Sequence, residues 1–142
     1  MLRFRSLGSG STGNATVIEA GNGLQTTRLL VDCGLFEGSR TLETLNRSPF
    51  PCPVEHVDAV ILTHAHIDHS GLLPRLVAQG FSGPVYCTAP TRDLLDHMLA
   101  DSARIQEGDV ARRNRRKDRA DEPVFEPLYT EADAVAAAAN GL

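Results

Sequence analysis

Near the middle of the chain, an apolar run over residues 57–62 ends in a dense cluster of histidine and aspartate side chains. A run of this kind is typical of a strand that is covered on both faces. The cluster that follows it consists of His64, His66, Asp68 and His69. Burying four titratable groups beside a strand is costly unless they share a ligand. The pattern therefore predicts a buried strand that carries a metal-binding loop at its C-terminal end.

The segments before this run indicate a set of strands. Residues 2–7, 16–20 and 27–31 are rich in β-forming side chains and are separated by glycine-containing turns, which predicts three antiparallel strands. The first of them enters a glycine loop over residues 8–14. Residues 39–46 have the spacing of a short helix.

The segments after the cluster alternate between helix and strand. Ser70 is predicted to cap a helix whose apolar face consists of Leu72, Leu73, Leu76 and Val77. Residues 84–87 read as a second buried strand, and residues 91–99 as a further helix. We therefore expect an α/β fold in which a mixed sheet has flanking helices.

Composition narrows the class of protein. The hydrophobic content of 42% and the charged content of 23% are typical of a globular chain. With 14 Lys and Arg against 18 Asp and Glu, the net charge of −4 gives no general affinity for nucleic acid or membranes. No apolar run approaches the roughly 20 residues that span a bilayer, so we expect a cytoplasmic protein without membrane contact. The three cysteines (Cys33, Cys52 and Cys87) form no Cys-x-x-Cys pair and are expected to be reduced.

The spacing within the cluster suggests two metal ions. Side chains two apart on an extended segment share a face, so His64 and His66 are expected to bind one ion. Asp68 and His69, past the bend, then reach a second ion. Two zinc ions, or manganese in their place, about 3.5 to 4 Å apart would hold and deprotonate a bridging water. The plainer alternative is that these side chains pack into a turn without metal.

The hexapeptide His64 to His69 resembles the His-x-His-x-Asp-His signature of metallo-β-lactamase fold hydrolases. Other segments look like the N-terminal part of the β-CASP nucleases, the RNA-processing branch of that family. These segments are Asp32 to Gly38, Thr63 to Pro74, Gly83 to Tyr86, Asp101 to Glu107 and Pro127 to Thr130. The likeness extends from about Leu7 to Asp133. The glycine loop departs from it and looks more like that of small stand-alone hydrolases and exonucleases.

The resemblance implies a fold and a set of roles. The chain would form the N-terminal half of an αββα sandwich. His64 and His66 would ligate one zinc ion, and Asp68 and His69 the second. Asp68 would also orient the attacking hydroxide toward phosphorus. Asp32 matches the carboxylate of the family's first motif and would orient the ligand loop, although a turn-forming aspartate is an alternative interpretation.

A basic segment follows the predicted helix over residues 91–99. We expect a division into residues 1–100, the half domain, and residues 101–142, a basic helical segment leading toward a missing β-CASP region. Four arginines are candidates for contacts with RNA phosphates, namely Arg112, Arg113, Arg115 and Arg116, with Lys117 and Arg119 beside them. The alternative is a solvated helix face balanced by neighbouring acidic residues.

These observations favour a zinc-dependent RNA phosphodiesterase. No histidine follows His97, so the downstream ligands that the family uses are missing, and we expect a truncated chain with weak or no activity. A partner chain or a missing C-terminal part would then complete the site. The alternatives are a hydrolase of a small ester, thioester or lactone, and an inactive fragment or interaction module.

Overall fold

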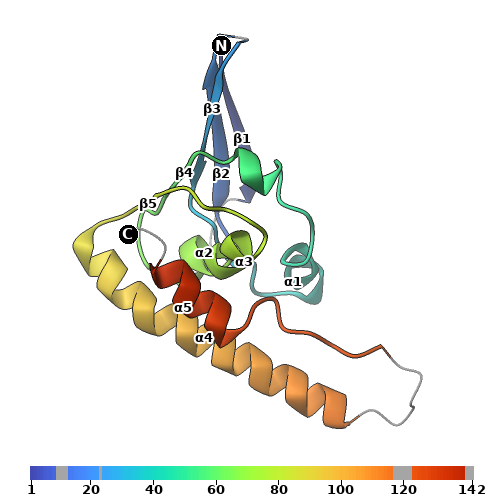
Figure 1. Cartoon of the computed structure of the whole chain (residues 1–142). Coiled ribbons are helices and arrows are strands. Elements are labelled where there is room, and N and C mark those ends of the chain that lie inside the picture. The colour runs from blue at the N-terminus through green and yellow to red at the C-terminus, as the bar shows by residue number, and fades with distance from the viewer. Residues whose placement is uncertain (9–12, 23, 117–122, 140–142) are drawn as a thin grey trace.

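The computed structural model describes residues 1–8, 13–22, 24–116 and 123–139. Figure 1 shows a sheet whose first three strands extend away from a group of helices. The elements in chain order are β1 (Leu2–Gly8), β2 (Ala15–Gly21), β3 (Thr26–Val31), α1 (Arg40–Leu45), η1 (Val54–His56), β4 (Ala59–Ile61), α2 (Ile67–Ser70), α3 (Leu73–Ala78), β5 (Val85–Tyr86), α4 (Ala89–Arg115) and α5 (Glu131–Ala139).

The described strands form one five-stranded sheet in the order β1-β2-β3-β4-β5. β1, β2 and β3 pair antiparallel, whereas β3, β4 and β5 pair parallel. The three antiparallel strands and the mixed α/β class are thus confirmed. Residues 9–12 of the expected glycine loop lie outside the described residues.

One face of the sheet builds the core. Val17 pairs with Leu30, Leu30 with Val60, and Val60 with Val85, so these side chains form one row across four strands. All four are 4% exposed or less. Burial of such a side chain contributes about 1.5 to 3 kcal/mol. The row shares its hydrophobic cluster with leucines of α3 and α4: Leu73, Leu76, Leu95 and Leu99.

The opposite face of the sheet is only partly covered. Phe4 is 66% exposed, Ile61 37% and Tyr86 58%. The expectation that the strands over residues 57–62 and 84–87 are covered on both faces is therefore wrong at Ile61 and Tyr86. An apolar run does not distinguish one buried face from two, because that depends on what packs against the sheet.

The prediction that Ser70 caps a helix is also wrong. Ser70 is the last residue of α2, and its Oγ donates to the backbone oxygens of Ala65 at 2.9 Å and His66 at 3.1 Å. This side chain is fully buried. Its hydroxyl therefore closes the turn that precedes α2, and α3 begins without a capping side chain.

α4 is much longer than the helix expected over residues 91–99. Its buried positions are Thr91, Leu95, Leu99 and Ala103, and the helix continues to Arg115 with a largely exposed second half. Apolar periodicity marks only the part that packs against the core. The expected boundary between residues 100 and 101 falls inside this helix, and the division into two units stays a prediction.

A strap over residues 123–130 runs back along the second half of α4. The side-chain amide of Asn114 donates to the Phe125 oxygen and accepts from the Phe125 nitrogen, both at 2.9 Å. Gln106 Oε1 accepts from the Leu128 nitrogen at 3.3 Å, and Ser102 Oγ lies 3.0 Å from the Tyr129 hydroxyl oxygen. These polar contacts lead the chain into α5, which packs on α3 and α4.

All three cysteines are free, and Cys33 is buried. Burial raises the pKa of each thiol, most strongly that of Cys33. None of the helices among the described residues is both long and apolar enough to cross a bilayer.

We predict that a thiol-specific reagent labels Cys52 and Cys87 in the folded protein and labels Cys33 only after unfolding. Thiolate is the reactive species, and Cys33 lacks both solvent access and a tendency to ionise. Spectrophotometric titration with a disulfide reagent, with and without denaturant, counts the reactive thiols. Cys33→Ala should leave the number of thiols that react in the folded protein unchanged. Equal labelling of three thiols in the native protein would contradict the prediction.

Candidate metal centre

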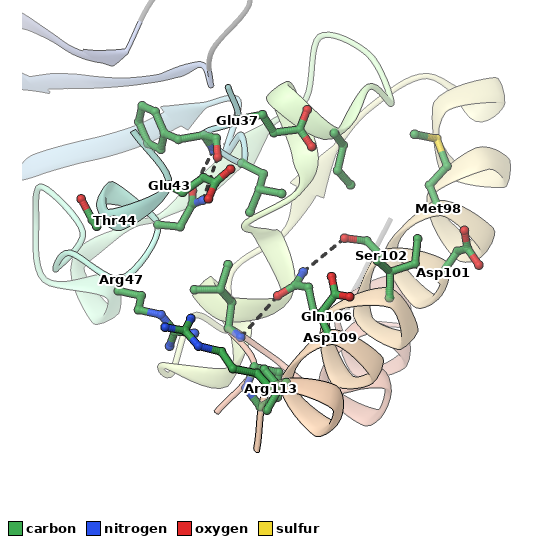
Figure 2. Close-up of a pocket in the computed structure, with 18 residues that line it drawn as sticks. Glu37, Glu43, Thr44, Arg47, Met98, Asp101, Ser102, Gln106, Asp109 and Arg113 are labelled. Atoms are coloured by element: carbon green, nitrogen blue, oxygen red, sulfur yellow. Dashed lines mark hydrogen bonds between the residues drawn. The ribbon is translucent and has the colours of Figure 1, made fainter. Parts of the chain in front are cut away.

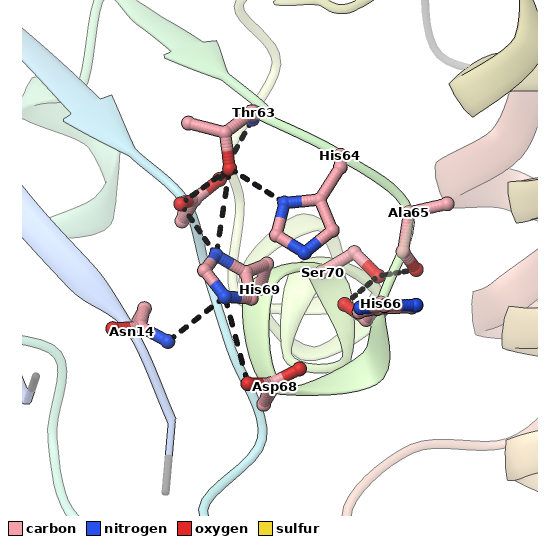
Figure 3. A network of polar contacts seen from close by, with 9 residues as sticks. Asn14, Thr63, His64, Ala65, His66, Asp68, His69 and Ser70 are labelled. Atoms are coloured by element: carbon pink, nitrogen blue, oxygen red, sulfur yellow. Dashed lines mark hydrogen bonds and ion pairs between the residues drawn. The ribbon is translucent and has the colours of Figure 1, made fainter. Parts of the chain in front are cut away.

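The loop between β4 and α2, together with α2 itself, brings the four predicted ligand side chains together. The His64 ring centroid lies 4.0 Å from that of His69 and 4.8 Å from that of His66. His69 Nε2 lies 3.5 Å from Asp68 Oδ2. Figure 3 shows these side chains around the first turn of α2. We call residues 64–69 the histidine loop.

Asp32 lies at the end of β3, beside the histidine loop. Its carboxylate accepts from the Thr63 backbone nitrogen at 2.8 Å and from His69 Nδ1 at 2.8 Å. The residue is buried, at 5% exposure, and its φ is 60°. This left-handed conformation is uncommon outside glycine, although aspartate adopts it more readily than most residues. Asp32 thereby holds the ring of His69 in one orientation.

Thr63 is a member of this network that the sequence reasoning did not single out. Its Oγ1 lies 3.0 Å and 2.9 Å from the two carboxylate oxygens of Asp32 and 3.0 Å from His64 Nδ1. The hydroxyl therefore connects Asp32 to the first histidine of the loop. In the sequence, only its position directly before the histidine loop indicated that Thr63 belongs to this network.

Backbone hydrogen bonds attach the histidine loop to the segment after β3. The Cys33 nitrogen donates to the His69 oxygen at 2.7 Å, and the Leu35 nitrogen donates to the Ile67 oxygen at 3.0 Å. These bonds satisfy main-chain groups that regular strands or helices leave unpaired here. The loop is therefore fixed by its backbone as well as by Asp32.

Gly34 makes this attachment sterically possible. A Cβ at this position would lie 1.7 Å from the Asp68 oxygen and 2.7 Å from the Asn14 nitrogen. The Asn14 nitrogen donates to that same Asp68 oxygen at 2.7 Å, and the Gly34 nitrogen donates to the Asn14 oxygen at 2.9 Å. Three backbone segments thus meet where a side chain cannot fit.

The second ring nitrogen of His69 also has a partner. Asn14 Nδ2 lies 3.0 Å from His69 Nε2, on the opposite side of the ring from Asp32. Figure 3 shows the Asn14 amide directed at this atom. Both nitrogens of the ring are therefore engaged by the protein.

The donor chemistry of the histidine loop fits a divalent cation. Imidazole nitrogen and carboxylate oxygen are the ligands that zinc prefers in hydrolytic sites. The His69 and Asp68 side chains keep 20% and 23% exposure, so ions can reach them. Within the described ranges, no three His, Cys, Asp or Glu side chains are arranged to hold one ion. The residue types are therefore those that bind a divalent metal ion, but their donor atoms are not directed at a single point.

A groove of about 1050 Å³ lies beside the histidine loop and meets it at Ile67. α1, α4 and the strap form its walls. In Figure 2, Arg47 and Arg113 lie at one end of the groove and Met98 lies at the other. Carboxylates line it as well, including Glu37 and Asp101. It offers apolar contact surface and charges of both signs.

The four candidate RNA-binding arginines lie at the C-terminal end of α4, and we call them the C-terminal arginines (Arg112, Arg113, Arg115 and Arg116). All four are exposed. Arg112 pairs with Asp109, and the Arg113 guanidinium lies 3.5 Å from the ring centroid of Phe125. Arg113 also lines the groove. Lys117 and Arg119 lie outside the described residues.

Comparison with known proteins identifies a family. The profile of the metallo-beta-lactamase superfamily matches residues 8–136. A crystal structure of the metallo-beta-lactamase fold protein YhfI from Bacillus subtilis aligns with a TM-score of 0.39 at 26% identity, covering 62% of this chain and 37% of that one.

Two relatives are much longer than this chain. Ribonuclease TTHA0252 of Thermus thermophilus is 40% identical over 120 residues, which make up 84% of this chain and 23% of the ribonuclease. Transcription termination factor FttA of Methanosarcina mazei is 50% identical over 70 residues, which make up 49% of this chain and 11% of the factor. The chain spans less than a quarter of the length of either relative.

We predict that Gly34→Ala destabilises the protein by about 3 kcal/mol, because the new Cβ would force the Asp68 and Asn14 backbones apart. Denaturant unfolding monitored by circular dichroism measures the change. Gly108→Ala in α4 is the matched control, since its Cβ would meet nothing closer than Arg112 Nη1 at 3.9 Å. That control should be stabilised by about 0.5 to 1 kcal/mol. Similar effects of the two substitutions would argue against the close contact at Gly34.

Proposed function

Because the chain belongs to the metallo-beta-lactamase superfamily, we propose that it forms part of a metal-dependent phosphodiesterase that cleaves RNA. The observation that carries this proposal is the proximity of three imidazoles and a carboxylate within the histidine loop, with Asp32 bonded to His69. Relatives named as a ribonuclease and a transcription termination factor support the choice of RNA. We assign the chain to the β-CASP branch and propose a cytoplasmic location.

We propose zinc as the metal, with manganese as a substitute, in two adjacent positions. His64 and His66 would hold one ion, and Asp68 and His69 the other. A pair of such ions, when bound, lowers the pKa of water and neutralises charge on a phosphate. Since the ribonuclease relative is several times longer, we propose that polypeptide outside this sequence supplies further ligands and that this chain alone has weak activity.

The side chains of the histidine loop have separate tasks in the proposed reaction. Asp68 orients the attacking water toward phosphorus and accepts its proton. The water oxygen forms the new bond to phosphorus while the bond from phosphorus to the leaving oxygen breaks, and that oxygen takes up a proton. Asp32 and Thr63 act indirectly, because they fix the rings of His69 and His64.

The C-terminal arginines are our candidates for binding the RNA backbone. They form an exposed basic surface, and one of them, Arg113, lines the groove that also meets the histidine loop at Ile67. Carboxylates such as Glu37 and Asp101 line the groove itself and would repel phosphates. We therefore place the phosphate contacts at the arginines rather than along the groove.

A zinc titration tests the metal assignment. We expect the wild-type chain to bind two zinc ions, and His64→Ala with His66→Ala to remove one of them. The measurement is equilibrium dialysis followed by elemental analysis. His97→Ala, which changes an exposed histidine of α4, should bind as the wild type does. A wild-type chain that holds no zinc or manganese after loading would favour an inactive interaction module.

RNA binding provides the second test. Replacing the four C-terminal arginines by alanine should weaken the binding of single-stranded RNA. It should also reduce the salt dependence of binding, by a slope of about 0.7 for each phosphate that an arginine no longer neutralises. Fluorescence anisotropy at several salt concentrations measures both effects.

A charge-matched variant separates local contacts from net charge. It replaces four arginines outside the C-terminal group by alanine: Arg3, Arg5, Arg92 and Arg104. This variant should retain most of the affinity for RNA. If both variants bind RNA as the wild type does, and zinc-dependent turnover is seen only with a small ester, thioester or lactone, the protein is a small-molecule hydrolase instead.

A further inference from the structure

We propose that Asn14 competes with the second metal ion for His69 and thereby weakens that site relative to the first. This inference rests on the proposed function, because it takes His69 as a ligand of the second ion. Asn14 directly precedes β2 and is remote in sequence from the histidine loop. Its side chain is nevertheless within hydrogen-bond distance of the ring nitrogen that faces Asp68.

The partners of the His69 ring define which nitrogen would bind the ion. Asp32 accepts a hydrogen bond from Nδ1, so in the neutral ring the proton is on Nδ1 and Nε2 presents a lone pair. A metal ion would bind at this lone pair. Asn14 Nδ2 donates to the same lone pair at 3.0 Å. The amide and a metal ion therefore cannot use His69 Nε2 at the same time.

The position of the Asn14 amide is set by its backbone. The Asn14 nitrogen donates to the Asp68 oxygen, and its oxygen accepts from Gly34. These two bonds hold Asn14 against the residues that carry the second site. The side chain must therefore rotate away from His69 before an ion can bind there, and the main chain stays in place.

This competition lowers the affinity of only the second of the two proposed metal positions. His64 Nδ1 contacts the Thr63 hydroxyl, whereas the Asn14 amide is directed at Nε2 of His69. A neutral hydrogen bond to a ring nitrogen is worth a factor of about five in affinity. Asn14 therefore leaves the affinity for the first ion unchanged, and the second ion binds about fivefold more weakly than it would without Asn14.

The test is a zinc titration of the full chain with Asn14→Ala and Asn14→Leu. Leucine keeps the branching of asparagine at Cγ but has no donor, whereas alanine removes the amide altogether, so the pair separates hydrogen bonding from packing. Isothermal calorimetry with a competing chelator resolves the two binding steps. Both variants should strengthen the second step about fivefold and leave the first unchanged. Asn22→Ala, in the turn between β2 and β3, is the matched control and should match the wild type in both steps.

A second measurement detects the hydrogen bond between Asn14 and His69 in the absence of metal. The ¹⁵N shifts of the His69 ring in metal-free protein report the proton on Nδ1 and an accepted hydrogen bond at Nε2. Asn14→Leu should move the Nε2 signal and keep the tautomer. An unchanged or weakened second binding step in both variants would overturn the proposal. A different result would reject the metal function on which the proposal rests: the wild type binds no zinc, although Asn14→Leu still moves the Nε2 signal.

Discussion

The geometry of the histidine loop depends on the close approach of two backbones, at Gly34 and Asp68. A Cβ on Gly34 would overlap the Asp68 oxygen, so the contact exists only because this position has no side chain. It allows the segment after β3 to exchange hydrogen bonds with the histidine loop on one side and with Asn14 on the other. Three segments that are distant in sequence are thereby joined into one rigid unit.

Much of this arrangement could be predicted from local pattern. Alternating residues and glycine turns identify β1, β2 and β3, and the apolar run before His64 identifies β4. Local pattern also places Asp32 at the end of a strand, whereas its role beside the ligand loop came from the family resemblance. The structure brings Asp32 to the histidine loop because β3 and β4 are parallel neighbours whose C-terminal ends meet at one edge. The metal roles of His64, His66, Asp68 and His69 rest on residue type and spacing and stay predictions.

Features that depend on tertiary partners could not be predicted. Thr63 and Asn14 are ordinary residues in the sequence, and their importance lies in contacts across the fold. Exposure at Ile61 and Tyr86 depends on what covers the sheet rather than on the strand itself. The contact between the Arg113 guanidinium and the Phe125 ring could not be predicted either, because the two residues are separated in the chain and the strap brings them together.

The two halves of α4 are held by different forces. Leu95 and Leu99 anchor the first half in the hydrophobic core, whereas Asn114 and Gln106 hold the second half through hydrogen bonds with the strap. Water competes readily for such polar bonds, so the far end of the helix detaches at a lower free energy than the core. The amide protons near Arg113 should therefore exchange through a local opening that leaves the sheet and the histidine loop intact, and the basic surface can adapt its shape independently of the metal centre.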